Sequence, residues 1–251
     1  MSLFDNLCSR QTVRQYTDRP VDEQLLRRLL EAAARTQTMG NLQLYSVVVT
    51  RDAERKARLA PAHFNQPMVE QAPVVLTICA DFNRTSTWCR CRKANPGYDN
   101  PLSFLNAATD ALLYTQTLSL LLEEAGLGVC YLGTTIYQPQ QIIDVLCLPE
   151  LVFPVATLTV GYPQPQTEPQ PERLPLDAFV HAEAYEDYKP ADIDCLYKEK
   201  EEHPVNRHFV ELNKTETLAQ IFAHIRYTRE ANEAMSQALI AALRRQKFLE
   251  E

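Results

Sequence analysis

The order of apolar and polar residues along the chain alternates between helix-like and strand-like spacing. After Asp22, a residue type that caps helix N-termini, apolar residues recur at helical spacing: Leu25, Leu26, Leu29, Leu30 and Ala33. Short apolar runs predict buried strands over residues 43–50, 74–80, 128–132 and 155–161. Further helices are predicted over 3–9, 51–60, 68–71 and 138–146. Because helices and strands alternate imperfectly, we expect an α+β fold or a mixed α/β sandwich, with one central sheet.

The longest predicted helix covers residues 103–125 and ends at Gly126, a typical helix-terminating residue. Its apolar residues occupy several faces: Phe104, Leu105, Ala108, Leu112, Leu118, Leu121 and Leu122. A helix with this pattern is buried in the middle of a fold or in an interface. Phe104 is a lesser candidate for substrate stacking and a better one for the core.

Two stretches lack a periodic pattern. Residues 83–101 are polar and predict a long loop, and residues 163–175 are dense in proline and predict an extended arm. Helical patterns return over 193–202 and 209–248. We therefore expect a single domain over residues 1–251. This domain is expected to include an extended proline-rich arm over 163–190 and a helical C-terminal extension over 191–251.

Composition narrows the function. The net charge of −7 disfavours a nucleic-acid partner, which usually meets a basic surface. No apolar run approaches the ~18 residues of a membrane span, and no N-terminal stretch resembles a signal peptide. The seven cysteines are odd in number and scattered, which disfavours a disulfide framework. These features predict a cytoplasmic protein without a membrane partner.

The sequence lacks the motifs of several common metal-binding, nucleotide-binding and catalytic sites. Cys89 and Cys91 are too close together for a zinc site and lack a second ligand pair, and the histidines have no metal-like spacing, so we expect no metal. Gly126 and Gly128 lie between a predicted helix and a strand, the reverse of the dinucleotide-binding order. The chain also lacks a P-loop, a GxSxG motif and an HExxH motif.

The first candidate site segment is Arg10-Gln11-Thr12-Val13-Arg14. Guanidinium groups and a hydroxyl suit a phosphate, because guanidinium groups form paired hydrogen bonds with phosphate oxygens. The alternative interpretation is a solvated arginine cluster at a helix end.

Three further segments carry amides or glycines. Asn41 and Gln43 lie in Thr38–Tyr45, and Asn65-Gln66 precedes a short predicted helix. An amide offers donor and acceptor atoms, as the pyrimidine edge of a flavin requires. Residues 126–134 contain glycines, which let backbone approach a ring closely. The alternatives are a loop whose amides cap backbone groups and a buried strand that ends in a turn.

A fifth segment, Glu172-Arg173-Leu174-Pro175, follows the proline-dense arm. In this order, the five segments resemble the nitroreductase family of FMN-dependent oxidoreductases, closest to its NADPH-preferring, oxygen-insensitive group A. The resemblance spans residues 10–173. The chain departs from the family at Leu44-Tyr45, where Pro-Trp is usual, and at Pro171, where group A members often have lysine.

The resemblance implies a role for each matching residue. Arg10, Thr12 and the late Arg173 would hold the phosphate and ribityl end of FMN, with Gln11 contributing through its backbone. Arg14 would lie near N1 and O2 of the flavin and tune its reactivity, as would a backbone N–H near Thr134 at flavin N5. The remaining implied contacts are Thr38, Met39 and Asn41 to the flavin of the other subunit, Asn65 and Gln66 to the pyrimidine edge, and Tyr131, Gly133 and Thr134 under the ring.

The resemblance also implies a fold and an activity. The fold is a three-layer sandwich with a mixed central sheet flanked by helices, in an intertwined homodimer. The activity is ping-pong transfer of two electrons from NADPH or NADH to a small-molecule oxidant such as a nitroaromatic, a quinone or a free flavin. Other flavin chemistry (dehalogenation or flavin cleavage), a non-catalytic flavin-binding protein and a cofactor-free helical dimer remain as alternatives.

The basic stretch Trp88-Cys89-Arg90-Cys91-Arg92-Lys93 within residues 84–101 has two interpretations. One is a solvated surface loop. The other is a lid over the flavin, whose cations would meet the phosphate of a nicotinamide donor.

Overall fold

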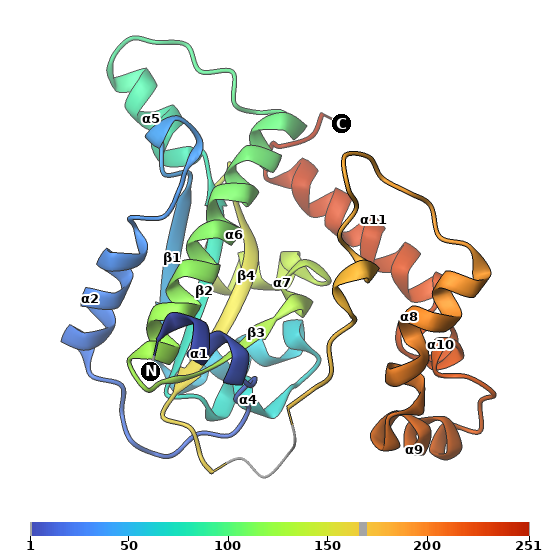
Figure 1. Cartoon of the computed structure of the whole chain (residues 1–251). Coiled ribbons are helices and arrows are strands. Elements are labelled where there is room, and N and C mark those ends of the chain that lie inside the picture. The colour runs from blue at the N-terminus through green and yellow to red at the C-terminus, as the bar shows by residue number, and fades with distance from the viewer. Residues whose placement is uncertain (1, 166–169, 251) are drawn as a thin grey trace. The chain divides into compact units, whose positions relative to one another are not determined.

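The structure is a computed structural model that describes residues 2–165 and 170–250. The chain divides into two compact units (Figure 1). The first unit comprises Met1–Glu168 and Met235–Glu251, and the second comprises Pro169–Ala234. That residues 1–251 form a single domain stays a prediction.

The first unit is built on a four-stranded sheet with the strand order β1-β2-β4-β3. The strands are β1 (Tyr45–Thr50), β2 (Val74–Asp81), β3 (Gly128–Leu132) and β4 (Val152–Gly161). Every pair among these described strands is antiparallel. The α+β class is confirmed, whereas the mixed sheet is not found within the described part of this chain. Strand β2 runs opposite to β1 and β4, and β4 runs opposite to β2 and β3.

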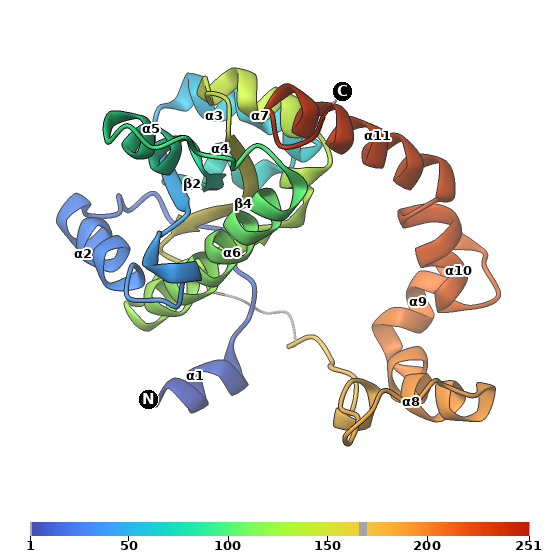
Figure 2. The same cartoon turned by 90° about the horizontal axis from the view of Figure 1, so that it is seen from above.

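Helices cover both faces of this sheet and make three layers (Figures 1 and 2). On one face lie α2 (Glu23–Ala33) and the long α6 (Pro101–Glu124). On the other lie α3 (Ala53–Leu59), α4 (Pro67–Gln71) and α7 (Pro139–Leu146). The predicted three-layer sandwich is therefore confirmed.

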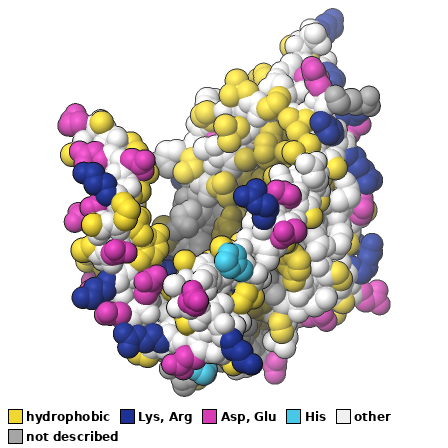
Figure 3. All heavy atoms as spheres, turned by 90° about the vertical axis from the view of Figure 1, so that its right-hand side faces the viewer, with side chains coloured by type: hydrophobic (Ala, Val, Ile, Leu, Met, Phe, Trp, Pro, Cys, Tyr) yellow, Lys and Arg dark blue, Asp and Glu magenta, His cyan; other side chains and the backbone are white. Residues whose placement is uncertain are grey.

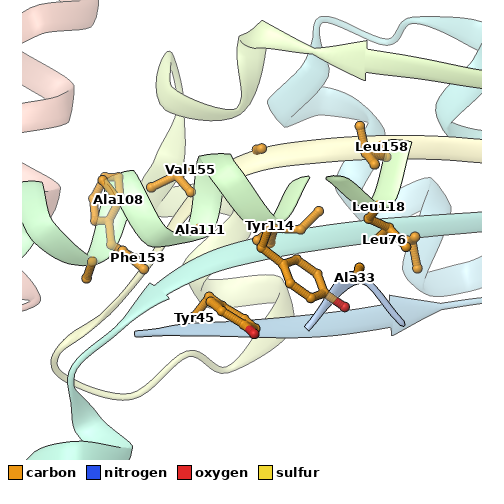
Figure 4. Close-up of a cluster of buried hydrophobic side chains, with 14 of the residues drawn as sticks. Ala33, Tyr45, Leu76, Ala108, Ala111, Tyr114, Leu118, Phe153, Val155 and Leu158 are labelled. Carbon is orange, nitrogen blue, oxygen red and sulfur yellow. The ribbon is translucent and has the colours of Figure 1, made fainter. Parts of the chain in front are cut away.

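The larger core lies between α6 and the sheet (Figure 4). Tyr114 of α6 stacks on Tyr45 of β1 with ring centroids 4.3 Å apart. Phe104 packs against Phe153 and Phe248, at centroid distances of 5.3 and 5.4 Å. Phe104 is thus a core residue, which was the favoured interpretation over substrate stacking.

Several predicted boundaries are confirmed. Helix α1 covers Leu3–Ser9, the Asp22 side chain accepts from the Leu25 N–H as the N-cap of α2, and Gly126 follows α6 with a φ of +79°. The long loop over 83–101 is wrong in its first half, where α5 covers Asn83–Cys91. Thr and Ser have low helix propensity, but burial of Thr85 and Ser86 against the fold overrides it.

The second unit is helical. Its elements are η4 (Leu176–Ala178), α8 (Pro190–Glu202), α9 (Pro204–Asn213), α10 (Leu218–Ile221), the π-helical turn η5 (Phe222–Arg226) and the first part of α11 (Arg229–Arg245). The helical tail predicted over 209–248 consists of several helices, and Lys214 ends α9 with a left-handed φ of +55°. Acidic, basic and exposed apolar side chains intermingle on the face shown in Figure 3.

The predicted proline-rich arm is largely irregular. Among its described residues, 163–165 and 170–189, the regular elements are an isolated bridge from Pro163 to Tyr16 and the short η4. Residues 166–169 of the arm lie outside the described part of the chain.

Candidate functional site

The first candidate segment lies along strand β3. The Val13 N–H donates to the Val129 carbonyl at 3.0 Å. The Tyr16 hydroxyl bonds to the Val13 carbonyl at 2.8 Å and to the Thr159 hydroxyl at 2.7 Å. Val13 and Tyr16 are both buried, so apolar burial and these hydrogen bonds fix the backbone of the segment against the sheet.

Both arginines of this segment lie close to β3. The Arg10 guanidinium donates to the Glu123 carboxylate at the end of α6, with Nη2 2.8 Å from Oε1. Arg14 is exposed, and Gln11 and Thr12 between the arginines are half-buried. Burial raises the pKa of the Cys130 thiol on β3, and the charges of Arg14 and Arg10 partly oppose that rise. The structure therefore gathers two cations at this strand.

The opposite end of β3 is open. Tyr131 is 48% exposed, and a Cβ added at Gly133 would meet no atom within 4 Å in the described part of the chain. Gly133 begins the 3-10 turn η3 (Gly133–Ile136). Within it, the buried Thr135 hydroxyl donates to the Leu132 carbonyl at 2.8 Å, which anchors the turn to the sheet.

A buried histidine joins this turn to the segment with Asn65 and Gln66. His63 ends the 3-10 turn η2 (Ala60–His63), and its Nδ1 lies 2.9 Å from the Thr134 hydroxyl. The Phe64 ring meets the Tyr137 ring edge-on at 6.3 Å. Two predicted groups of site residues, far apart in sequence, thus lie side by side.

Burial lowers the pKa of His63 to about 4, so the ring is neutral at neutral pH. Our sequence interpretation gave this residue no role, because a single histidine without metal-like spacing carries no signal. After it, Phe64 and Asn65 both adopt left-handed φ values, of 55° and 53°. Left-handed backbone is uncommon outside glycine, which makes this a defined turn that presents Asn65 and then Gln66.

The loop with Thr38, Met39 and Asn41 is held by another unpredicted residue, Asp110. Its carboxylate accepts from the Met39 N–H at 2.8 Å and from the Leu44 N–H at 3.1 Å, and it is fully buried. The sequence did hold a signal here, because Asp110 is the one charged residue between Pro101 and Leu122. A lone acid in an apolar helix needs buried donors.

The loop with Thr38, Met39 and Asn41 is not brought to the β3 edge within one chain. The loop containing η1 (Met39–Asn41) leads into β1, at the opposite edge of the sheet from β3. Three strand spacings separate those edges, or about 14 Å. Arg173 belongs to the second unit, where its guanidinium donates to the carbonyls of Pro171 and Glu172.

The described residues contain no group of three or more His, Cys, Asp or Glu side chains placed to hold a metal ion. Among the same residues, no helix combines the length and apolarity needed to cross a bilayer.

Comparison with known proteins identifies the family. The profile of the nitroreductase family matches residues 7–162. An FMN reductase [NAD(P)H] of Bacillus subtilis is 35% identical over 185 residues, covering 73% of this chain and 74% of that protein. An oxygen-insensitive NADPH nitroreductase of Salmonella typhimurium is 30% identical, covering 72% and 73%.

A solved structure agrees with these relatives. The crystal structure of a protein from Bacteroides fragilis superposes with a TM-score of 0.96 at 56% identity, and it covers 98% of this chain and 100% of its own. The profile match extends over more than half of the chain and includes β1 to β4, together with the segments that flank β3. The chain belongs to the nitroreductase family.

Proposed function

We propose that this protein is an FMN-dependent oxidoreductase that carries two electrons from NADPH or NADH to a nitroaromatic, a quinone or a flavin. The observation that carries the proposal is the edge of β3. Arg10 and Arg14 lie at one end, and the open turn at Gly133 and Thr134, beside Asn65, lies at the other. The relatives named above as FMN reductase and NADPH nitroreductase support the same activity.

The dimensions and chemistry of this edge fit FMN. Strand β3, from Gly128 to Leu132, spans roughly 13 Å at the usual rise per strand residue, and the η3 turn extends this edge further. Cations suit its phosphate, side-chain amides suit its pyrimidine edge, and the open space above Gly133 suits a flat ring. FMN, when bound, supplies the two-electron chemistry, and the protein supplies binding, orientation and electrostatics.

Individual roles follow from the positions along β3. Arg10 and Thr12 bind the phosphate and ribityl chain, with Gln11 contributing through its backbone. Arg14 reaches toward N1 and O2, where a cation stabilises negative charge on the reduced ring. Asn65 and Gln66 bind the pyrimidine edge, and Tyr131, Gly133 and Thr134 underlie the ring. Arg173 adds a further cation for the phosphate. Pro171, two residues earlier, has no charge to add.

We further propose a homodimer that completes each site. The loop with Thr38, Met39 and Asn41 is held at the β1 edge, about 14 Å from β3, so within one chain it serves no site at β3. A second copy would bring this loop to the first copy's flavin. Helices α1 and α6 also expose large apolar side chains suited to an interface: Leu3, Phe4, Leu7, Leu102, Leu105, Leu112 and Leu113.

All seven cysteines are free, which is typical of a reducing compartment and supports the proposed cytoplasmic location.

The basic C-terminal turn of α5 and the residues after it remain a candidate lid that would bind the phosphate of a nicotinamide donor. Trp88 on α5 is 57% exposed and leaves this face accessible.

The deciding experiment is a visible absorption spectrum of the purified protein before and after anaerobic NADPH. A flavin spectrum that bleaches supports the reductase. A flavin spectrum that neither NADPH nor NADH bleaches favours a non-catalytic flavin-binding protein, and colourless protein that FMN does not reconstitute leaves only a cofactor-free dimer. Screening of oxidants with and without oxygen separates reduction from dehalogenation or flavin cleavage.

Dimerisation has its own test. Leu105→Glu places a charge among the exposed apolar residues of α6 and should shift the molar mass in light scattering from dimer to monomer. Val49→Glu, a similar change at a 41% exposed apolar residue of β1, serves as the matched control. A monomeric wild-type protein would contradict the proposal.

A further inference from the structure

Among the described residues at the β3 edge, His63 is a buried titratable side chain that the proposed function has not used. Its side chain is fully buried, and its Nδ1 lies 2.9 Å from the Thr134 hydroxyl. Its other ring nitrogen, Nε2, has no hydrogen-bond partner in the described part of the chain. The contact with Thr134 is therefore the polar interaction that sets the orientation of this ring.

The same contact links two backbone turns. On one side, His63 ends η2 directly before the left-handed residues Phe64 and Asn65. On the other, Thr134 lies in η3, where its carbonyl accepts from the Tyr137 N–H at 3.0 Å. The edge-on contact of Phe64 with Tyr137 is a second tie between these turns.

We propose that His63 is a positioning residue that holds the Thr134 turn in register with the Asn65 turn, so that one hydrogen bond aligns the groups that face flavin N5 with those that face the pyrimidine edge. The inference rests on the proposed function for the identity of the ligand. The alignment itself is a property of the chain and is present without FMN.

Physical reasons favour the imidazole in this role. The neighbouring Thr135 hydroxyl is already bonded to the Leu132 carbonyl and to the Thr157 hydroxyl, so Thr135 holds the turn to the sheet. Nothing among the described hydrogen bonds other than His63 restrains the Thr134 hydroxyl. A neutral imidazole buried among apolar residues has few alternative orientations. It therefore holds η2 and η3 in a fixed position relative to each other.

The test compares variants that remove the hydrogen bond with variants that keep it. Thr134→Val and His63→Phe remove it at similar volume. Thr134→Ser keeps the hydroxyl, and His63→Asn places an amide near the position of Nδ1. Thr117→Val is the matched control, because it removes a threonine hydroxyl hydrogen bond of the same 2.9 Å length, to Thr36, on the other face of the sheet.

Three readouts separate positioning from general stability. In FMN-free protein, amide hydrogen exchange of residues 133–137 should rise roughly five-fold in Thr134→Val and His63→Phe, as expected for loss of one hydrogen bond. In reconstituted protein, both variants should shift the flavin midpoint potential in the same direction. They should also lower the rate of flavin reduction at saturating NADPH without a matching change in FMN content.

Thr117→Val should behave like wild type in all three readouts, and Thr134→Ser and His63→Asn should keep the wild-type hydrogen exchange of residues 133–137 in FMN-free protein. The double variant His63→Phe with Thr134→Val should be no worse than either single variant, since both remove the same interaction. If His63→Phe does not fold, the comparison of Thr134→Val with Thr134→Ser decides.

Failure of this inference is distinct from failure of the proposed function. Wild-type protein that binds FMN and is reduced, together with a Thr134→Val variant unchanged in exchange and potential, would overturn the inference and leave the function intact. Wild-type protein that never binds FMN would overturn the function, and the exchange measurement would still decide whether His63 holds the turn.

Discussion

Arg10 is joined to Glu123 by an ion pair that ties the N-terminal segment to the end of α6. Nη2 of Arg10 lies 2.8 Å from Oε1 of Glu123, and Nε of Arg10 lies 3.2 Å from the same oxygen. The two side chains are only 30% and 17% exposed. Partial burial and paired hydrogen bonds hold this guanidinium in one place before any ligand arrives, which lowers the entropic cost of binding a phosphate.

Arg10→Ala should therefore weaken FMN binding by about ten-fold or more, the range expected for loss of a charged hydrogen bond. Arg173→Ala should also lower FMN occupancy. Affinity is measured by quenching of flavin fluorescence on titration of the apoprotein. Arg27→Ala is the matched control, because Arg27 pairs with Glu31 on a well-exposed helix face. Unchanged FMN content in both the Arg10 and the Arg173 variant would contradict the assigned phosphate site.

Asp110 gives a prediction about stability. Asp110→Ala leaves two backbone N–H groups without an acceptor, those of Met39 and Leu44. The free energy of unfolding should fall by about 3 kcal/mol, and Asp110→Asn, which keeps one acceptor oxygen, should cost less. Urea denaturation at fixed protein concentration measures both. Thr109→Ala, one residue earlier on an exposed part of α6, should change little. Equal stability of Asp110→Ala and wild type would show that water replaces the carboxylate.

The sequence predicts the strands, most helices of the first unit and the grouping of Arg10 with Arg14 well, because each depends on local patterns. Apolar runs and helical spacing locate the four strands and most helices of the first unit. The arginines at residues 10 and 14 lie in one short segment, and the structure shows both beside β3. In these cases, the residues that form the pattern are close together in the sequence.

The sequence predicts less where distant segments meet. The Glu123 partner of Arg10 and the Thr134 partner of His63 are far away along the chain, and no local pattern encodes either contact. Helix α5 was missed for a related reason, because tertiary burial of Thr85 and Ser86 overrides their weak helix propensity. The antiparallel pairing of β4 with both neighbours likewise depends on long-range topology.

Gly128 offers a test of how the N-terminal segment is seated. A Cβ added there would lie 2.5 to 2.7 Å from the side-chain atoms of Val13. Gly128→Ala should therefore push the segment away from β3, lower the unfolding free energy by about 1–3 kcal/mol and weaken FMN binding. Val13→Ala in the same chain should restore part of the loss, since it clears the space. Gly97→Ala, which meets no atom within 4 Å, is the control. A double variant as unstable as the sum of its single changes would contradict this packing.

The buried histidine makes stability depend on pH in a defined window. Burial lowers the pKa of His63 from about 6.5 to about 4. Above pH 6.5 the ring is neutral in both the folded and the unfolded state, and it contributes no pH dependence. As the pH falls from 6.5 to 4, the unfolded state takes up a proton that the folded state resists, so stability is lost.

The full loss from this group should reach about 3 kcal/mol below pH 4. Unfolding free energies of wild type and His63→Asn, compared at each pH, isolate it, because the other titrating groups are shared. Since Asn does not titrate, the two curves should run parallel above pH 6.5 and converge toward or cross each other below it, as wild type loses stability faster. Curves that stay parallel down to pH 4 would show that His63 is protonated as easily in the folded protein as in the unfolded chain.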